Sequence, residues 1–181
     1  MPSKQSQREL EEYTRRTVVR LIKEAGTMIR REVVRRHALT AEANIEYAKR
    51  LREQIIEDYQ SLSMPLEGIL REGMDRLQKG EDIGDIIADA IVKGIGTAIM
   101  GALARPIEIV VGHINDVNSF VEDVVNKIIT ELSKEKIYLP KLNTVQLQSV
   151  NLPQVIIALK QAVDLMDRSV GILEGLIEVS K

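Results

Sequence analysis

Side chains that commonly perform acid–base chemistry or bind metals are scarce in this sequence. The chain contains two histidines, His37 and His113, and no cysteine. His113 and Asp116 stand three residues apart on a predicted helix and could share a proton or a metal ion. A zinc site needs three or four protein ligands, however, and this helix supplies no others beside them. We therefore predict neither a catalytic site nor a bound metal or cofactor.

Two other groups of residues resemble ligand-binding loops in composition only. Gly94 and Gly96, followed by Gly101, have no strand before them and no Gly-Lys-Ser/Thr after them, so they do not form a phosphate loop. We interpret them as small residues where helices pack closely. A group of acids lacks the spacing of a calcium loop and lies where carboxylates stabilise a helix N-terminus. These acids are Glu81, Asp82, Asp85 and Asp89.

Basic side chains are concentrated in the first third of the chain. Through Arg52 there are 13 Lys and Arg against 7 Asp and Glu, whereas the remainder has 12 against 20. Guanidinium and ammonium groups along a helix bind phosphate oxygens without reading a base sequence. The predicted nucleic-acid-binding residues are Arg15, Arg16, Arg20, Lys23, Arg30, Arg31, Arg35, Arg36, Lys49, Arg50 and Arg52.

Three other interpretations of this basic region stay open. Glutamates among the arginines, including Glu12 and Glu24, can form pairs four residues apart and leave an ordinary solvated face. A basic amphipathic helix can lie on an anionic lipid surface, although the apolar side here lacks Trp and Phe. The chain can also be a helical-bundle interaction protein that binds partner helices and no nucleic acid.

The apolar pattern predicts an all-α protein, a multi-helix bundle with two parts. Residues 1–62 form a basic N-terminal helical arm, and residues 63–181 form an apolar helical core. The core is filled by aliphatic side chains, because aromatics make up only 3% of the chain. This composition also disfavours a single-strand binder that stacks bases on aromatic rings.

Capping residues and helix breakers set the expected helix boundaries. Ser6 and Glu9 fit a capping box at the start of a long first helix. Thr40 is expected to cap a second helix, and Gly80 to end a short third one. A fourth, glycine-containing helix is expected to end or kink at Pro106.

Two apolar ladders with alternating steps of three and four residues predict two long helices in the core. This spacing places their apolar residues on one seam of each helix, as in a coiled coil. We expect these seams to form the subunit interface, while the same pattern also allows the two helices to pair within one chain. The seam residues are Ile107, Val110, Ile114, Val117, Val121, Val124, Ile128, Ile156, Leu159, Val163, Met166, Val170, Leu173 and Ile177.

The segment between the two ladders, residues 134–152, is predicted to be extended. It contains Pro140 and alternates apolar and polar residues near Val145, and Asn151 with Pro153 marks the next helix start. A connector of this length is uncommon in a compact bundle. We expect it to span a partner subunit or to wrap the edge of the bundle.

The sequence contains no pattern for export or membrane insertion. Its N-terminus is polar and charged, without the apolar stretch of a signal peptide. The longest uncharged piece of the apolar region, Gly94 to Ala104, is too short to cross a bilayer. We expect a protein of the cell interior or of a virion, neither secreted by a signal peptide nor transmembrane.

An arginine-rich helical arm, Ile/Val-rich helices with small residues, few aromatics and a long connector together resemble the major coat proteins of filamentous and rod-shaped viruses of hyperthermophilic archaea. The resemblance covers the general layout of the chain and includes no diagnostic motif. It implies a thermostable structural protein that pairs with itself or a paralogous subunit and wraps double-stranded DNA into a helical filament. It also allows an outer lipid envelope as a partner. The net charge of −2 departs from this pattern, and a more basic partner subunit would compensate for it.

Overall fold

The computed structural model describes residues 4–25, 28–63, 79–80, 82, 85 and 97–181. These residues confirm the all-α prediction, since they contain helices and no strand. The helices are α1 (Lys4–Ala25), α2 (Met28–Ser63), α5 (Thr97–Phe120), α6 (Asn126–Lys134) and α7 (Leu152–Ser180). A π-helical turn, η2 (Val121–Val125), joins α5 to α6. No described helix combines the length and the apolar character needed to cross a membrane.

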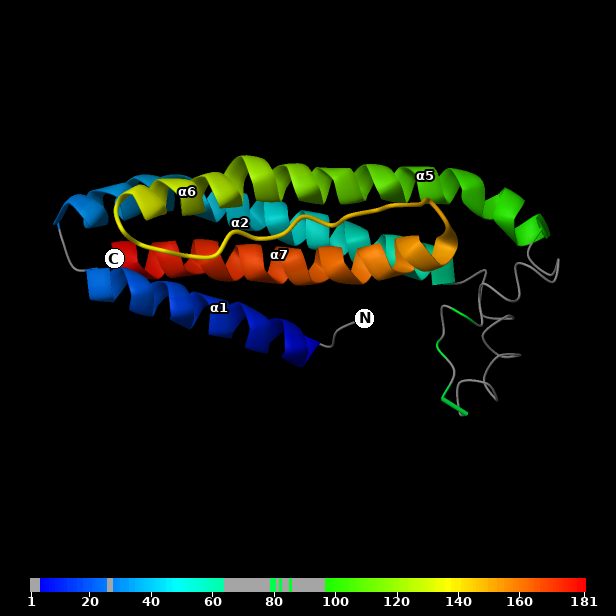
Figure 1. Cartoon of the computed structure of the whole chain (residues 1–181), viewed down its shortest axis with the longest axis horizontal. Coiled ribbons are helices and arrows are strands. Elements are labelled where there is room, and N and C mark those ends of the chain that lie inside the picture. Colours follow the sequence, from blue (N-terminus) through cyan, green and yellow to red (C-terminus); the bar gives the residue numbers. More distant parts are fainter. Residues whose placement is uncertain (1–3, 26–27, 64–78, 81, 83–84, 86–96) are drawn as a thin grey trace.

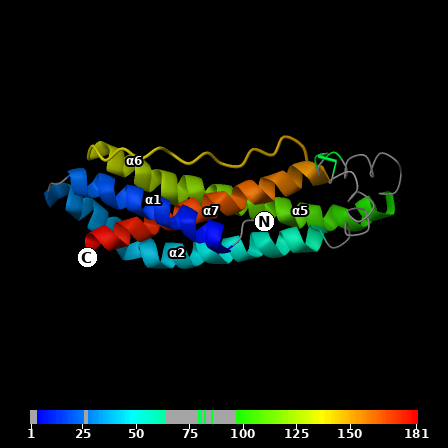
Figure 2. The ribbon, with the colours of Figure 1, turned by 90° about the horizontal axis from the view of Figure 1, so that it is seen from below.

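Helix α7 is the centre of an elongated bundle. It contacts α1 on one side and α2 and α5 on the others (Figures 1 and 2). Asn151 caps its N-terminus by accepting a hydrogen bond from the Gln154 amide at 3.0 Å, and Pro153 follows, which confirms the predicted helix start. Most of its residues from Val155 to Leu176 are buried. A helix that is apolar around most of its circumference must be covered by neighbours on several sides.

Helix α2 belongs to the same core. Five residues spaced by seven have no exposed surface, namely Val34, Ala41, Ala48, Ile55 and Leu62. The helix therefore runs without interruption past Thr40, and the prediction of a helix start there is wrong. The Thr40 hydroxyl instead donates to the His37 carbonyl oxygen within the helix. Only α1 keeps the position of an arm on the outside of the bundle (Figure 1).

Other predicted boundaries also differ. Helix α1 already includes Lys4, so Ser6 lies inside the helix rather than at its cap. Helix α5 passes through Pro106 and continues to Phe120, because its apolar face stays buried beyond the proline. The predicted third helix, up to Gly80, and the start of the fourth fall largely outside the described residues.

The two predicted seams lie in the core of this one chain. Val117 and Val163, for example, have no exposed surface. In this conformation such side chains pack within the chain, which is the second of the two pairings that the ladders allow, and they are not available to another subunit. Those that are buried are Ile107, Val110, Ile114, Val117, Val121, Ile128, Leu159, Val163, Met166, Val170 and Leu173. Val124, Ile156 and Ile177 are partly buried and pack against the same core.

The π-helical turn changes which residues of the first seam point inward. A π turn takes in one extra residue and so rotates the positions that follow it. Val125 is fully buried, whereas Val124, the position expected from the alternating steps, is only partly buried. The seam then continues through Ile128, Ile129 and Leu132 in α6.

The connector between α6 and α7 runs extended along its own bundle (Figure 1). Asn118 and Asn126 hold it by side-chain amides, and each makes two hydrogen bonds to one connector residue. Asn118 Nδ2 donates to the Val145 carbonyl at 2.9 Å, and Asn118 Oδ1 accepts from the Val145 amide at 2.8 Å. Asn126 pairs with the backbone of Leu142 in the same way, at 3.0 and 2.9 Å. Of the two predicted paths, the connector therefore follows the second, along the edge of its own bundle.

Two glycines allow α1 to lie close to α7. A Cβ atom at Gly171 would be 2.6 Å from Thr14 Cβ and 2.7 Å from the Glu11 carbonyl oxygen. A Cβ atom at Gly175 would be 2.8 Å from Val18 Cβ. Any larger residue would therefore push the two helices apart.

Gly171→Ala tests this close contact. Although alanine favours helix formation, we expect the free energy of unfolding to fall by about 1–3 kcal/mol, because α1 has to shift to relieve the overlap. Gly112 is the matched control, since a Cβ there meets no atom within 4 Å. Gly112→Ala should raise stability by up to about 1 kcal/mol. Urea denaturation measures both, and equal effects of the two substitutions would contradict the packing described.

Asn118→Ala tests the attachment of the connector. Loss of both hydrogen bonds should expose the Val145 amide and speed its hydrogen–deuterium exchange by about tenfold or more, since each bond contributes about 0.5–1.5 kcal/mol. Asn115→Ala, on the exposed side of the same helix, is the control. An unchanged exchange rate at Val145 in Asn118→Ala would show that burial alone holds the connector.

Candidate nucleic-acid interface

Exposed basic residues gather at one end of the bundle. The last turns of α1, the first turns of α2, the end of α6 and the C-terminus all lie there in both views (Figures 1 and 2). Arg20 and Lys23 come from α1, and Arg35 and Arg36 from α2. All four are exposed, and none forms an ion pair with a residue that the structure describes. We call these four residues the basic end.

Four of the predicted residues also line a shallow hollow of about 380 Å³ beside the end of α7, together with Glu24 and Glu178. These four are Arg15, Arg16, Arg20 and Lys23. Arg15 is bonded to Glu178, and this contact raises the pKa of its guanidinium. Arg16 pairs with Glu12 at 3.2 Å but stays largely exposed. An exposed pair of this kind is weak, so Arg16 can exchange Glu12 for another anion.

The basic residues farther along α2 have mixed surroundings. Lys49 and Arg50 are exposed, and the Arg50 guanidinium lies over the Tyr47 ring, 5.9 Å from its centre. Glu46 and Glu53 are exposed among them. Lys49 is 13 residues beyond Arg36, which corresponds to about 20 Å along the helix. These residues are therefore separate from the basic end.

Arg52 is a buried residue, which corrects its assignment as an exposed phosphate contact. Only 8% of it is exposed, and its Nε donates to Asp167 Oδ1 at 2.6 Å. The other carboxylate oxygen, Asp167 Oδ2, is buried without a hydrogen-bond partner. Burial raises the pKa of Asp167 to about 6 in spite of the adjacent guanidinium. The position of Asp167 within the apolar run of α7 was the signal in the sequence for this buried pair, because a charged residue there needs a buried partner of opposite charge.

The side chains of Arg30 and Arg31 lie outside those that the structure describes. Their backbone belongs to the first turn of α2, at the same end of the bundle as Arg35 and Arg36.

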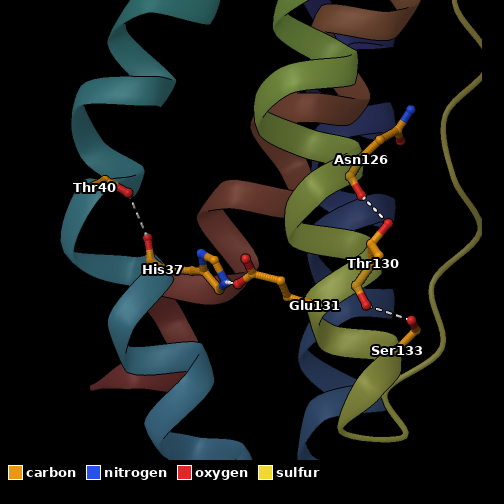
Figure 3. A network of polar contacts seen from close by, with 6 residues as sticks. All are labelled: His37, Thr40, Asn126, Thr130, Glu131 and Ser133. Carbon is orange, nitrogen blue, oxygen red and sulfur yellow. Dashed lines mark hydrogen bonds and ion pairs between the residues drawn. The ribbon is translucent and has the colours of Figure 1, made fainter.

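Both histidines link α2 to the helices on its other side. His37 Nε2 lies 2.5 Å from Glu131 Oε2 of α6, where Figure 3 shows the two side chains pointing toward each other. His113 Nδ1 lies 2.6 Å from Asp58 Oδ2, so His113 pairs across helices rather than with Asp116. Each histidine thus acts as a polar contact between packed helices.

The described residues contain no cluster of three or more His, Asp or Glu side chains suited to a metal ion. Of the predicted acidic group, Asp82 and Asp85 are described, and both are exposed. Glu81 and Asp89 lie outside the described residues, as do Gly94 and Gly96.

No protein-family model, curated protein or solved structure matches this chain. Its function therefore has to be inferred from the charge, burial and accessibility of its own side chains. Among these, the basic end combines four exposed cations that have no ion-pair partner in the described parts of the chain.

Asp167→Asn tests the buried carboxylate. Because the pKa of Asp167 is raised, its contribution to stability is fully present below the unfolded value near 4 and is lost as the pH rises through about 6. The loss amounts to about 3 kcal/mol. Denaturation between pH 4 and pH 7 should show this fall in the free energy of unfolding in the native protein and not in Asp167→Asn. Asp164→Asn, an exposed neighbour, should retain most of it, because the charge of Asp164 is a minor cause of the raised pKa. Identical pH profiles for all three proteins would contradict the raised pKa.

Proposed function

We propose that this chain is a structural nucleoprotein, a coat protein that assembles around double-stranded DNA as a helical filament. The basic end supplies sequence-independent phosphate contacts. The observation that carries the proposal is the exposure of Arg20, Lys23, Arg35 and Arg36, which have no ion-pair partner among the described residues. Their hydrogen-bond donors and charge remain available to a polyanion.

Duplex DNA is the ligand that best fits these groups. It presents one negative charge about every 1.7 Å along its axis, so cations from two adjacent helix ends can bind neighbouring phosphates. Guanidinium groups bind phosphate oxygens through two parallel hydrogen bonds. None of these contacts involves the bases, so the binding would not depend on the DNA sequence.

Assembly in this proposal depends on exposed surfaces, because the apolar seams are used inside the chain. The three most exposed large apolar side chains of the described residues are Tyr13 (71%) on α1, Leu39 (79%) on α2 and Tyr138 (68%) on the connector. Leu39 stands three residues after Arg36. A second copy or a paralogous subunit can cover these groups while the basic end contacts DNA.

The second candidate is a helical-bundle interaction protein that binds no nucleic acid. Its support is the alternation of acids and bases on the exposed side of α2, where Glu46 and Glu53 flank Lys49 and Arg50. Mixed charge of this kind suits a protein partner or water as well as it suits DNA.

Filter binding of duplex DNA across a salt series separates the two candidates. We expect retention at about 50 mM salt and a steep loss as salt rises, because each bound phosphate adds about 0.9 to the log–log slope. Replacing Arg20, Lys23, Arg35 and Arg36 with Gln should reduce that slope by up to about 3.6.

The matched control replaces four other exposed cations with Gln, namely Arg8, Lys79, Arg105 and Lys160. It changes the net charge equally and should leave the slope nearly unchanged. If the native protein fails to retain duplex at low salt, or if both variants lose binding equally, the basic end is not a DNA interface. Circular dichroism should show equal helix content for all the proteins.

A further inference from the structure

A second hollow lies between the first turns of α1 and the middle of α2. It has a volume of about 410 Å³ and is lined by Lys4, Gln7, Lys49, Arg52, Glu53 and Ile56. The start of α1 lies near the middle of the bundle in both views, so this hollow is distant from the basic end (Figures 1 and 2). Nothing in the proposed packaging of DNA uses it.

Arg52 provides the buried part of the hollow. More than nine-tenths of this residue is buried, and its Nε is bound to Asp167. A guanidinium carries five N–H donors, and its two Nη groups make no hydrogen bond to any described residue. Because Arg52 lines the hollow, these donors are accessible from it, and a ligand with acceptor oxygens can bind them.

The remaining polar groups of the hollow favour an anion. Lys4 and Lys49 add two ammonium groups. The Gln7 amide is also in the wall, and its Nε2 already donates to Glu11 Oε1 at 3.1 Å. The first-turn amides of α1 contribute positive potential at the same place. On the opposing side, Glu53 is in the wall and Asp167 lies behind Arg52. Counting Glu11, three cations thus face three carboxylates, of which Glu53 alone lines the hollow.

We propose that this hollow binds a tetrahedral oxyanion of the phosphate class. The Nη groups of Arg52 donate to two of its oxygens, as guanidinium does in bidentate phosphate contacts. Lys4 and Lys49 bind the remaining oxygens, and Asp167 fixes the plane of the guanidinium from behind. The phosphate comes either from a free ion or monoester, or from a nucleic-acid backbone.

Titration calorimetry of the full chain tests the site with three probes: inorganic phosphate, phenyl phosphate and a short DNA duplex. The informative variant is Lys4→Gln/Lys49→Gln, since both lysines are exposed and the buried Arg52–Asp167 pair stays intact. We expect its dissociation constant for phosphate to rise by about tenfold or more, because two charge-assisted hydrogen bonds to the anion are lost.

Arg20→Gln/Lys23→Gln is the matched control, because it removes two charges from the basic end instead. It should bind inorganic phosphate like the native protein, even where its duplex binding is weaker, so the two proposals fail separately. Binding of phosphate and phenyl phosphate indicates a free ion or monoester as the source. Weakening of duplex binding by the pocket variant indicates a backbone phosphate. Absence of heat with all three probes, or equal losses in the two variants, overturns the proposal.

Discussion

The burial of α7 is the constraint on which the rest of the structure depends. A helix with apolar residues around most of its surface is stable in water only when other helices cover it on several sides. In this chain α2 and α5 cover two sides, and α1 covers a third through its close approach to Gly171 and Gly175. Because α1 and α2 both pack on α7, their joined ends meet beside its C-terminus and bring the basic residues together.

The same arrangement accounts for the buried charges. Arg52 on α2 and Asp167 on α7 meet at 2.6 Å where two core helices touch. Truncating one member of such a pair leaves the other as a buried charge without a partner. The sequence therefore has to keep both residues together, whether or not the pair itself adds stability. The raised pKa of Asp167 shows that desolvation outweighs the attraction of the guanidinium. Arg52 also lines the hollow between α1 and α2.

Local patterns predicted the helical class, the extended connector and the start of α7, because each depends on residues close together in the sequence. The partners of Asn118 and Arg52 lie 27 and 115 residues away, and spacing along one helix contains no information about them. The apolar seams illustrate a different limit. Val117 and Val163 need an apolar neighbour, and the pattern is the same whether this neighbour comes from the same chain or another. The prediction at Thr40 was wrong because residues that cap helices also occur inside them. The buried residues spaced by seven from Val34 to Leu62 show that one helix continues past Thr40.

The net charge of −2 does not oppose DNA binding at the basic end. Helix α2 alone is about 54 Å long, whereas charges in water are screened over about 8–10 Å at physiological salt. Acids at the far end of the bundle therefore contribute little to the potential that a duplex meets here. Of the acids at the near end, Glu178 is bound to Arg15 and Glu131 to His37. Glu24 and Glu32 are exposed there, and they are outnumbered by the four cations of the basic end. Local charge, rather than the total for the chain, decides whether this surface attracts a polyanion.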